Sequence, residues 1–278
     1  MANEVAKKNE TFALVTGTEG MTEEAKAELE DELDDLDDDT GIMARAIKMP
    51  SGSVKAFSIE GATEDDAEVV KEFDGVILFT HRINAYWPTA ISDTGAGTPP
   101  ECSSFDGKTG LDISSGEMKQ CAACPHNQFR TDGTGKECKN MRRVYLLRSG
   151  QSVPYLLSVP PTSMKDFTKS LKQIMAGSTG YTHMVLTFGL KDSVSKGGIH
   201  YSKLTVRKKA DLSDDQAKVV EAIRKTVKEQ YKTVAITSGD YDSDVTPAAT
   251  SDTSGADAYE RPDEFTDASG KPEDLPFA

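Results

Sequence analysis

Residues 143–159 read RVYLLRSGQSVPYLLSV, and this stretch decides the predicted fold. Two runs rich in Val, Leu and Tyr, residues 143–148 and 153–159, flank a Ser-Gly-Gln-Ser turn. Such runs on either side of a short Gly-containing turn are typical of a β-hairpin. The prolines at 160 and 161 then predict a helix start, and apolar residues at helical spacing continue to about residue 176.

A predicted strand at 76–86 precedes this hairpin, and a second hairpin, 184–190 with 199–206, follows the helix. Five strands with a helix between the third and the fourth are the order of an OB-fold, a small barrel that binds oligonucleotides. We therefore expect a mainly β (α+β) protein, built on an OB-fold-like five-stranded barrel. Flanking helices, including one over 211–231, and disordered acidic termini complete this prediction.

Charge divides the chain into three regions. Residues 19–39 hold twelve acidic groups and one Lys, whereas residues 82–210 hold eighteen Lys and Arg against nine Asp and Glu. Residues 240–278 again hold eleven acidic groups against two basic ones. The net charge of −14 thus hides a basic body, the electrostatic pattern of a surface that binds a polyanion. We predict an acidic, partly disordered arm at 1–40, a DNA-binding domain at 41–236 and a disordered acidic tail at 237–278.

The sequence shows no run of about 18 apolar residues and no apolar secretory segment near its start. We therefore expect no membrane contact and a cytoplasmic location. In that reducing compartment, cysteines bind metal more often than they form disulfides.

All four cysteines lie within 37 positions, in a segment at about 99–141 that has few periodic apolar residues. They are Cys102, Cys121, Cys124 and Cys138. A C-x2-C pair with two flanking cysteines suits a closed, structural Zn²⁺ site of four thiolates, and binding would supply the folding free energy of the segment. An iron–sulfur cluster and a set of unrelated thiols are the alternatives, and His126 is close enough to replace one ligand.

Basic and aromatic residues alternate around the cysteines and in the second hairpin. Single strands are commonly held by a basic groove with aromatic rings on which the bases stack. The predicted DNA-binding residues are Tyr86, Trp87, Phe129, Arg130, Lys139, Arg142, Arg143, Tyr145, Tyr201 and Lys203. Core packing is the alternative for Trp87 and Tyr145, and a solvated strand end is the alternative for the basic residues.

The acidic tail ends in Pro272-Glu-Asp-Leu-Pro-Phe277 before a final Ala278. This tip resembles that of bacterial single-stranded DNA-binding proteins, whose acidic tails end in similar Asp-Asp-Ile-Pro-Phe sequences and recruit replication and repair enzymes. The resemblance implies partner binding by Asp274, Leu275, Pro276 and Phe277. In those proteins Phe is the last residue, so here the α-carboxylate is displaced by one position.

The cysteine segment also looks like a block found in phage-encoded proteins, and some phage single-stranded DNA-binding proteins carry zinc inside an OB-fold. If the gene belongs to a phage, the expected cytoplasmic location is the cytoplasm of the host.

Together these features predict a phage-type, sequence-nonspecific single-stranded DNA-binding protein that protects DNA and recruits replication and recombination proteins. The chain shows no Walker-type phosphate loop, no His-Glu-x-x-His and no clustered body carboxylates, so we expect no enzyme activity. A zinc-ribbon adaptor or transcriptional regulator, an iron–sulfur nuclease and a phage inhibitor of a host protein are the alternative functions.

Overall fold

The computed structural model describes residues 12–15, 21–35, 43–50, 52, 54–89, 97–131, 135–177, 180–195 and 198–241. All of them fall within one compact unit, Met1–Thr246. The predicted partner-binding tip, Asp274 to Phe277, lies outside the described residues, as does most of the predicted acidic tail.

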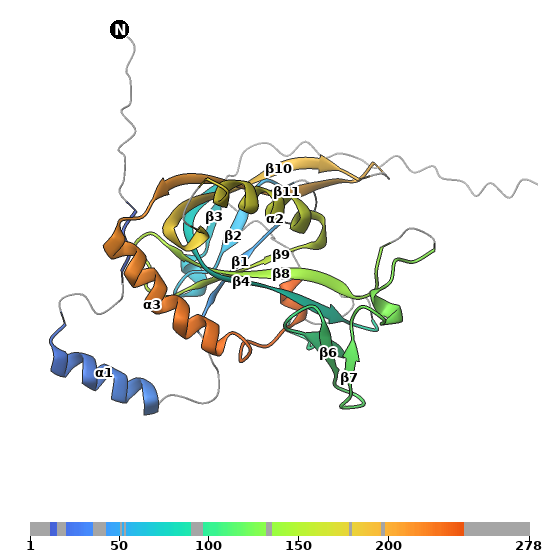
Figure 1. Cartoon of the computed structure of the whole chain (residues 1–278), viewed down its shortest axis with the longest axis horizontal. Helices are drawn as coiled ribbons and strands as arrows, with labels where there is room; N and C mark the ends of the chain where they lie inside the picture. Colours follow the sequence, from blue (N-terminus) through green and yellow to red (C-terminus); the bar gives the residue numbers. More distant parts are fainter. Residues whose placement is uncertain are drawn as a thin grey trace, which may run out of the picture. The chain divides into compact units, whose positions relative to one another are not determined.

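The elements follow the chain in a simple order (Figure 1). The strands are β1 (Arg45–Lys48), β2 (Phe57–Ile59), β3 (Glu68–Val70), β4 (Glu72–Tyr86), β5 (Cys102–Ser104), β6 (Thr109–Asp112), β7 (Met118–Gln120), β8 (Lys139–Arg148), β9 (Tyr155–Val159), β10 (Met184–Val194) and β11 (His200–Asp211). The helices are α1 (Glu23–Asp35), α2 (Pro161–Met175) and α3 (Asp214–Gln230). The 3-10 turns within the described residues are η1 (Glu64–Asp66), η3 (Pro125–Asn127), η4 (Tyr181–His183) and η5 (Ser238–Asp240).

The structure confirms a mainly β protein and all five predicted strands, β4, β8, β9, β10 and β11, with α2 between the third and the fourth. The central strand β4 pairs antiparallel with β8 on one side and with β10 on the other. Hairpin partners β9 and β11 extend the sheet from β8 and β10. The strands form one mixed sheet of eleven, in which β1 pairs parallel with β9.

This sheet is open within the described residues, so the closed barrel of an OB-fold is not confirmed. In a closed barrel β9 would pair with β11, but here β1 pairs with the outer edge of β9. Strand β11 contacts the segment after β1 through two hydrogen bonds of Ser202: its N–H donates to the Gly52 carbonyl (2.7 Å), and its hydroxyl donates to the Val54 carbonyl. Two residues further along β11, the Leu204 N–H donates to the Ser163 hydroxyl of α2 at 3.0 Å. Helix α2 therefore fills part of the gap that direct strand pairing would close.

Two apolar clusters cover the two faces of the central strands. One packs Phe167 and Leu171 of α2 against the inward side chains of the sheet, with Phe73 stacked on Phe188 at 5.0 Å between ring centroids. The other packs Val220 and Val227 of α3 against the opposite face. Figure 1 accordingly shows α2 and α3 on opposite sides of the central strands. Alternation along β8 decides which cluster each of its residues joins.

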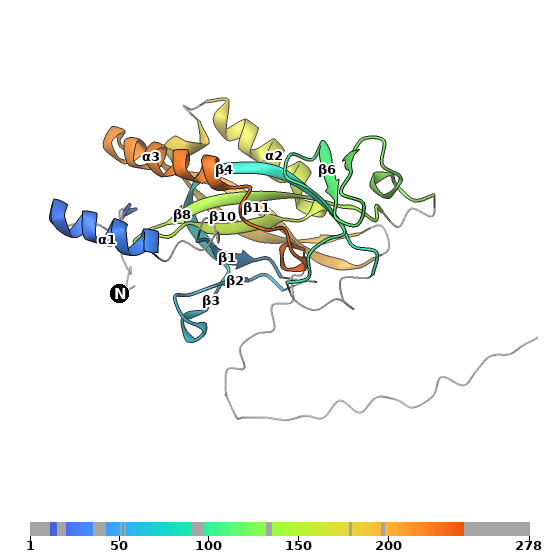
Figure 2. The same cartoon turned by 90° about the horizontal axis from the view of Figure 1, so that it is seen from below.

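Helix α3 begins where the sequence predicts, because Ser213 and Gln216 form a reciprocal capping box. The chain after α3, residues 231–241, continues along the α3 face of the sheet (Figure 2) and is called the strap below. Ile236 and Ser238 of the strap are buried, so the folded part extends to Tyr241. Within the part of the chain that the structure describes, no helix has the length and apolar content needed to cross a membrane.

Candidate metal centre and nucleic-acid surface

The cysteines lie in a small projection, the knob, formed by residues 101–131 and 135–138. Strands β5, β6 and β7 pair antiparallel there, and β5 joins the end of β4. Asp106 and Asp112 close the two tight turns by accepting from the backbone N–H groups of residues 108–109 and 115. Gly107 and Gly116 supply the positive φ values, +71° and +69°, that these turns need. The knob is thus built from turns and short strands, with little apolar core of its own.

The knob brings the four predicted metal ligands together. Cys102, Cys121, Cys124 and Cys138 all line one cavity of about 70 Å³. Their backbone is held in place: the Cys121 N–H donates to the Lys108 carbonyl and the Cys138 N–H to the His126 carbonyl, both at 2.8 Å. Residues from three separate segments therefore converge as the cysteine spacing predicts.

The electrostatics of this cavity agree with four thiols in close proximity. Burial, and then the charges of the other three thiols, raise the pKa of Cys138 to about 12. Burial, and then the charges of Cys121, Asp112 and Cys124, raise the pKa of Cys102. Such thiols stay neutral until a cation offsets the cost of ionising them. Among the described residues, no group of three or more His, Cys, Asp and Glu side chains has the arrangement needed to hold a metal ion. A Zn²⁺ ion would have to draw the sulfurs to about 2.3 Å from itself, so the metal stays a prediction.

His126 lines the same cavity but is engaged by its neighbours. Its ring stacks on Tyr86 with 4.0 Å between centroids, and its Nδ1 lies 2.7 Å from a carboxylate oxygen of Glu137. That hydrogen bond lowers the pKa of Glu137. Tyr86, predicted to stack on bases, thus forms a wall of the cysteine cavity in this structure.

The knob also carries the most exposed of the predicted DNA-binding aromatics. Phe129 is 77% exposed, and the Lys136 ammonium lies 5.1 Å from its ring centroid. Arg130 is exposed beside it and lies 3.6 Å from Glu137. A ring that is open on one face and flanked by cations suits a nucleobase attached to a phosphate chain.

Three predicted DNA-binding residues are buried instead. Arg143 is 1% exposed, Tyr145 is fully buried and Trp87 is 7% exposed. The physical reason is that α3 and the strap cover the face of the sheet to which they point. As the chain is folded here, Arg143 does not reach a phosphate, and the core alternative holds for Trp87 and Tyr145.

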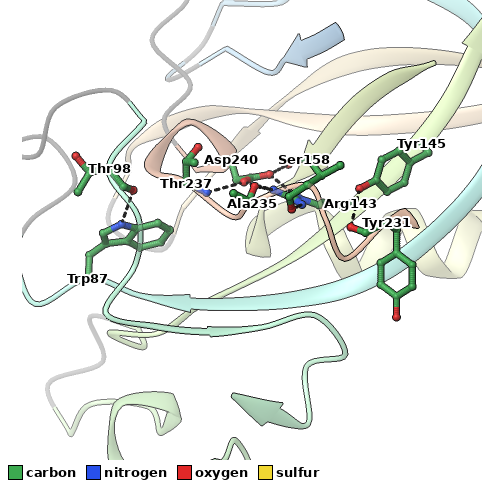
Figure 3. A network of polar contacts seen from close by, with 10 residues as sticks. Trp87, Thr98, Arg143, Tyr145, Ser158, Tyr231, Ala235, Thr237 and Asp240 are labelled. Atoms are coloured by element: carbon green, nitrogen blue, oxygen red, sulfur yellow. Dashed lines mark hydrogen bonds and ion pairs between the residues drawn. The ribbon is translucent and has the colours of Figure 1, made fainter. Parts of the chain in front are cut away.

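The Arg143 guanidinium is fully paired with the strap (Figure 3). It donates to both oxygens of the Asp240 carboxylate, at 2.9 and 2.6 Å, and to the carbonyls of Val234 and Ala235. Ser158 and the N–H of Thr237 also donate to Asp240. A carboxylate 97 residues away in sequence thus takes the place that a phosphate would need.

The other predicted basic residues remain at least partly accessible. Arg142 is half-buried and donates to the Thr80 hydroxyl at 3.2 Å, and Lys203 pairs with Asp166 of α2 at 2.8 Å. Lys139 is half-buried with its ammonium 5.1 Å from the ring centroid of Tyr241.

Sequence reasoning missed Tyr241, which it assigned to the tail. Together with Tyr201, it lines a cavity of about 510 Å³ between the strap, β1, β9, β11 and the start of α2. No local sequence signal marks this cavity, because its walls come from five separate segments. Comparison with known protein families, with curated proteins and with solved structures gives no match.

Proposed function

We propose that this protein binds single-stranded DNA without sequence preference and catalyses no reaction. The observation that carries the proposal is the pairing of the five central strands: β4 joins β8 and β10, and β9 and β11 extend each side. This connectivity is the one predicted for an OB-fold, although the open sheet leaves the barrel itself part of the proposal. In Figure 1, the knob between the first two strands and the β10–β11 hairpin extend to the same side. These are the two connections with which OB-folds hold oligonucleotides.

The chemistry would be electrostatic attraction with base stacking. Arg130, Lys136 and Lys139 on and beside the knob would neutralise phosphates and release counterions, while Phe129 would stack on a base. In this proposal four thiolates of the knob hold a structural Zn²⁺, whose role is to fix the loop that carries these residues. The proposal places the protein in the cytoplasm, where DNA strands are exposed during replication and recombination.

The acidic tail would recruit other proteins. Asp274, Leu275, Pro276 and Phe277 combine carboxylates with apolar side chains, which suits a basic-rimmed apolar pocket on a replication or recombination protein.

A protein adaptor is the second candidate, and one surface favours it. Leu111 and Met118 face each other across β6 and β7 and are 44% and 64% exposed, and Ile113 beside them is 58% exposed. Exposed apolar side chains on neighbouring strands are common in protein interfaces.

A titration of fluorescent oligo-dT against duplex of equal length, at two salt concentrations, tests the DNA-binding proposal. We expect a preference for the single strand and an affinity that falls steeply with salt, with a log–log slope of about −0.7 per phosphate contacted. Equal or tighter duplex binding would favour the adaptor or regulator instead. A variant that lacks residues 275–278 is the matched control: it should bind DNA normally and lose partner recruitment.

A further inference from the structure

The cavity beneath the strap has the size and lining of a binding site. Its volume of about 510 Å³ falls within the range of about 300–1,000 Å³ found for small-molecule sites. Most of its walls are apolar, from residues such as Met49, Leu156 and Pro160. Tyr201 and Tyr241 add two half-buried aromatic rings. An apolar cavity with two aromatic rings suits a flat, partly apolar ring system.

The charges at this cavity favour a ligand with a neutral group inside the cavity and an anionic group, such as a phosphate, at its opening. Lys48 lines the cavity with an exposed side chain, and the ammonium of Lys139 lies against the Tyr241 ring. Among the described lining residues, the only carboxylate is that of Asp240, and Arg143 neutralises it from below. A phosphate near Lys139 or Lys48 would therefore meet no unpaired negative charge from these lining residues.

We propose that this cavity receives a nucleobase of the bound single strand, with Tyr241 and Tyr201 as the stacking residues. The inference rests on the proposed single-stranded DNA binding and names where in the molecule a base is bound. Because the lining offers rings and apolar contacts rather than an array of free donors and acceptors, any of the four bases should be accepted.

The structure supplies an internal reporter for this site. Tyr241 packs against the cluster that contains Trp87, the single tryptophan of the chain. The indole N–H of Trp87 donates to the Thr98 carbonyl, and Thr98 in turn exchanges two hydrogen bonds with Ser238 of the strap (Figure 3 shows the Trp87 bond). A base in contact with Tyr241 should therefore change the fluorescence of Trp87.

The test compares oligo-dT with an abasic oligonucleotide of the same length and charge. We expect wild-type protein to bind oligo-dT more tightly than the abasic strand. Tyr241→Ala should reduce that preference by about 5- to 150-fold, the range for loss of one stacked base. Tyr241→Phe, which keeps the ring, should retain it. Abasic binding, which reports phosphate contacts alone, should not change in either variant.

Thr162→Phe provides a second variant that removes no core side chain. Thr162 is an exposed residue at the cavity, so a larger ring there should block the space and reduce the preference for oligo-dT as Tyr241→Ala does. Urea unfolding of each variant verifies that it is folded.

The two levels of the proposal fail in different ways. If wild-type protein binds neither oligonucleotide, the proposed function is wrong. If it prefers oligo-dT but neither Tyr241→Ala nor Thr162→Phe lowers this preference, DNA binding stands and the cavity is not the base site. A Trp87 signal that responds equally to oligo-dT and to the abasic strand would also contradict the cavity assignment.

Discussion

The knob and the sheet body reach order by different means. The body buries large apolar side chains in clusters beneath α2, beneath α3 and beneath the strap, and the buried members of these clusters are nearly inaccessible to solvent. In the knob, the buried side chains are few and mostly cysteine or polar, including Cys121, Cys138, Ser104 and Asp112. Apolar burial can stabilise the body by itself, whereas the knob has turns and hydrogen bonds and, in the proposed zinc site, a metal cross-link through its thiols. The two regions should therefore respond to different changes.

The largest effect is expected from loss of one cysteine. In Cys121→Ser, the proposed zinc site loses one of its four ligands, and binding of the whole ion supplies about 10–16 kcal/mol in structural sites of this kind. We expect about one zinc per chain in wild-type protein and much less in the variant. Hydrogen-exchange protection should be lost in the knob and should stay unchanged in β8 and β10. The measurements are elemental analysis and hydrogen exchange.

Ala122→Ser is the matched control, because it places the same hydroxyl one residue away on an exposed side chain. It should keep the metal and the protection of the knob. If wild-type protein contains neither zinc nor iron, or if Cys121→Ser leaves the knob protected from exchange, metal binding does not order the knob.

The next largest effect is expected within the body, at the strap. Asp240→Ala leaves the buried guanidinium of Arg143 without its carboxylate and should cost about 3–5 kcal/mol in the free energy of unfolding. Asp166→Ala breaks the more exposed pair with Lys203 and should cost no more than about 1 kcal/mol. Urea unfolding measures both. Equal losses would mean that the strap is not part of the folded body.

The smallest effect concerns His81, which joins the two regions. Its Nδ1 lies 2.9 Å from the Phe105 carbonyl of the knob, and its Nε2 is buried without a protein partner among the described residues. Burial lowers the pKa of His81, and the nearby charges of Arg143 and Arg142 lower it further, against the raising effect of its two backbone hydrogen bonds.

The sign of the pH effect follows from this direction. The unfolded chain takes up the proton below a pH of about 6.5, whereas the folded protein resists it. Stability from this group is therefore complete above about pH 6.5 and is lost as the pH falls towards the lowered pKa of the folded state. We expect the urea midpoint of wild-type protein to fall between pH 7.5 and 5.5, in part because of His81. His81→Asn keeps a donor for the Phe105 carbonyl and should remove the contribution of His81 to this fall. An unchanged decline would show that other groups cause it.

The local pattern of the sequence determined much of this protein. The β-rich apolar runs and the turn residues between them predicted the two hairpins at 143–159 and 184–206, and α2 and α3 begin near their predicted start signals. The cysteine spacing also indicated that the four thiols lie near one another, and all four line one cavity in the structure. The metal site that they are proposed to form stays a prediction. The wider charge pattern led to the functional proposal, which remains to be tested.

The tertiary structure alone decided the orientation of neighbouring side chains and what covers them. Arg142 and Arg143 are adjacent and chemically identical, yet one points to the α2 face and the other to the strap, because side chains alternate along a strand. The partner of Arg143 comes from Asp240, in a segment whose composition reads as tail. Local patterns specify strands and turns, but long-range packing of α3 and the strap determines whether a basic or aromatic residue is a surface group or part of the core.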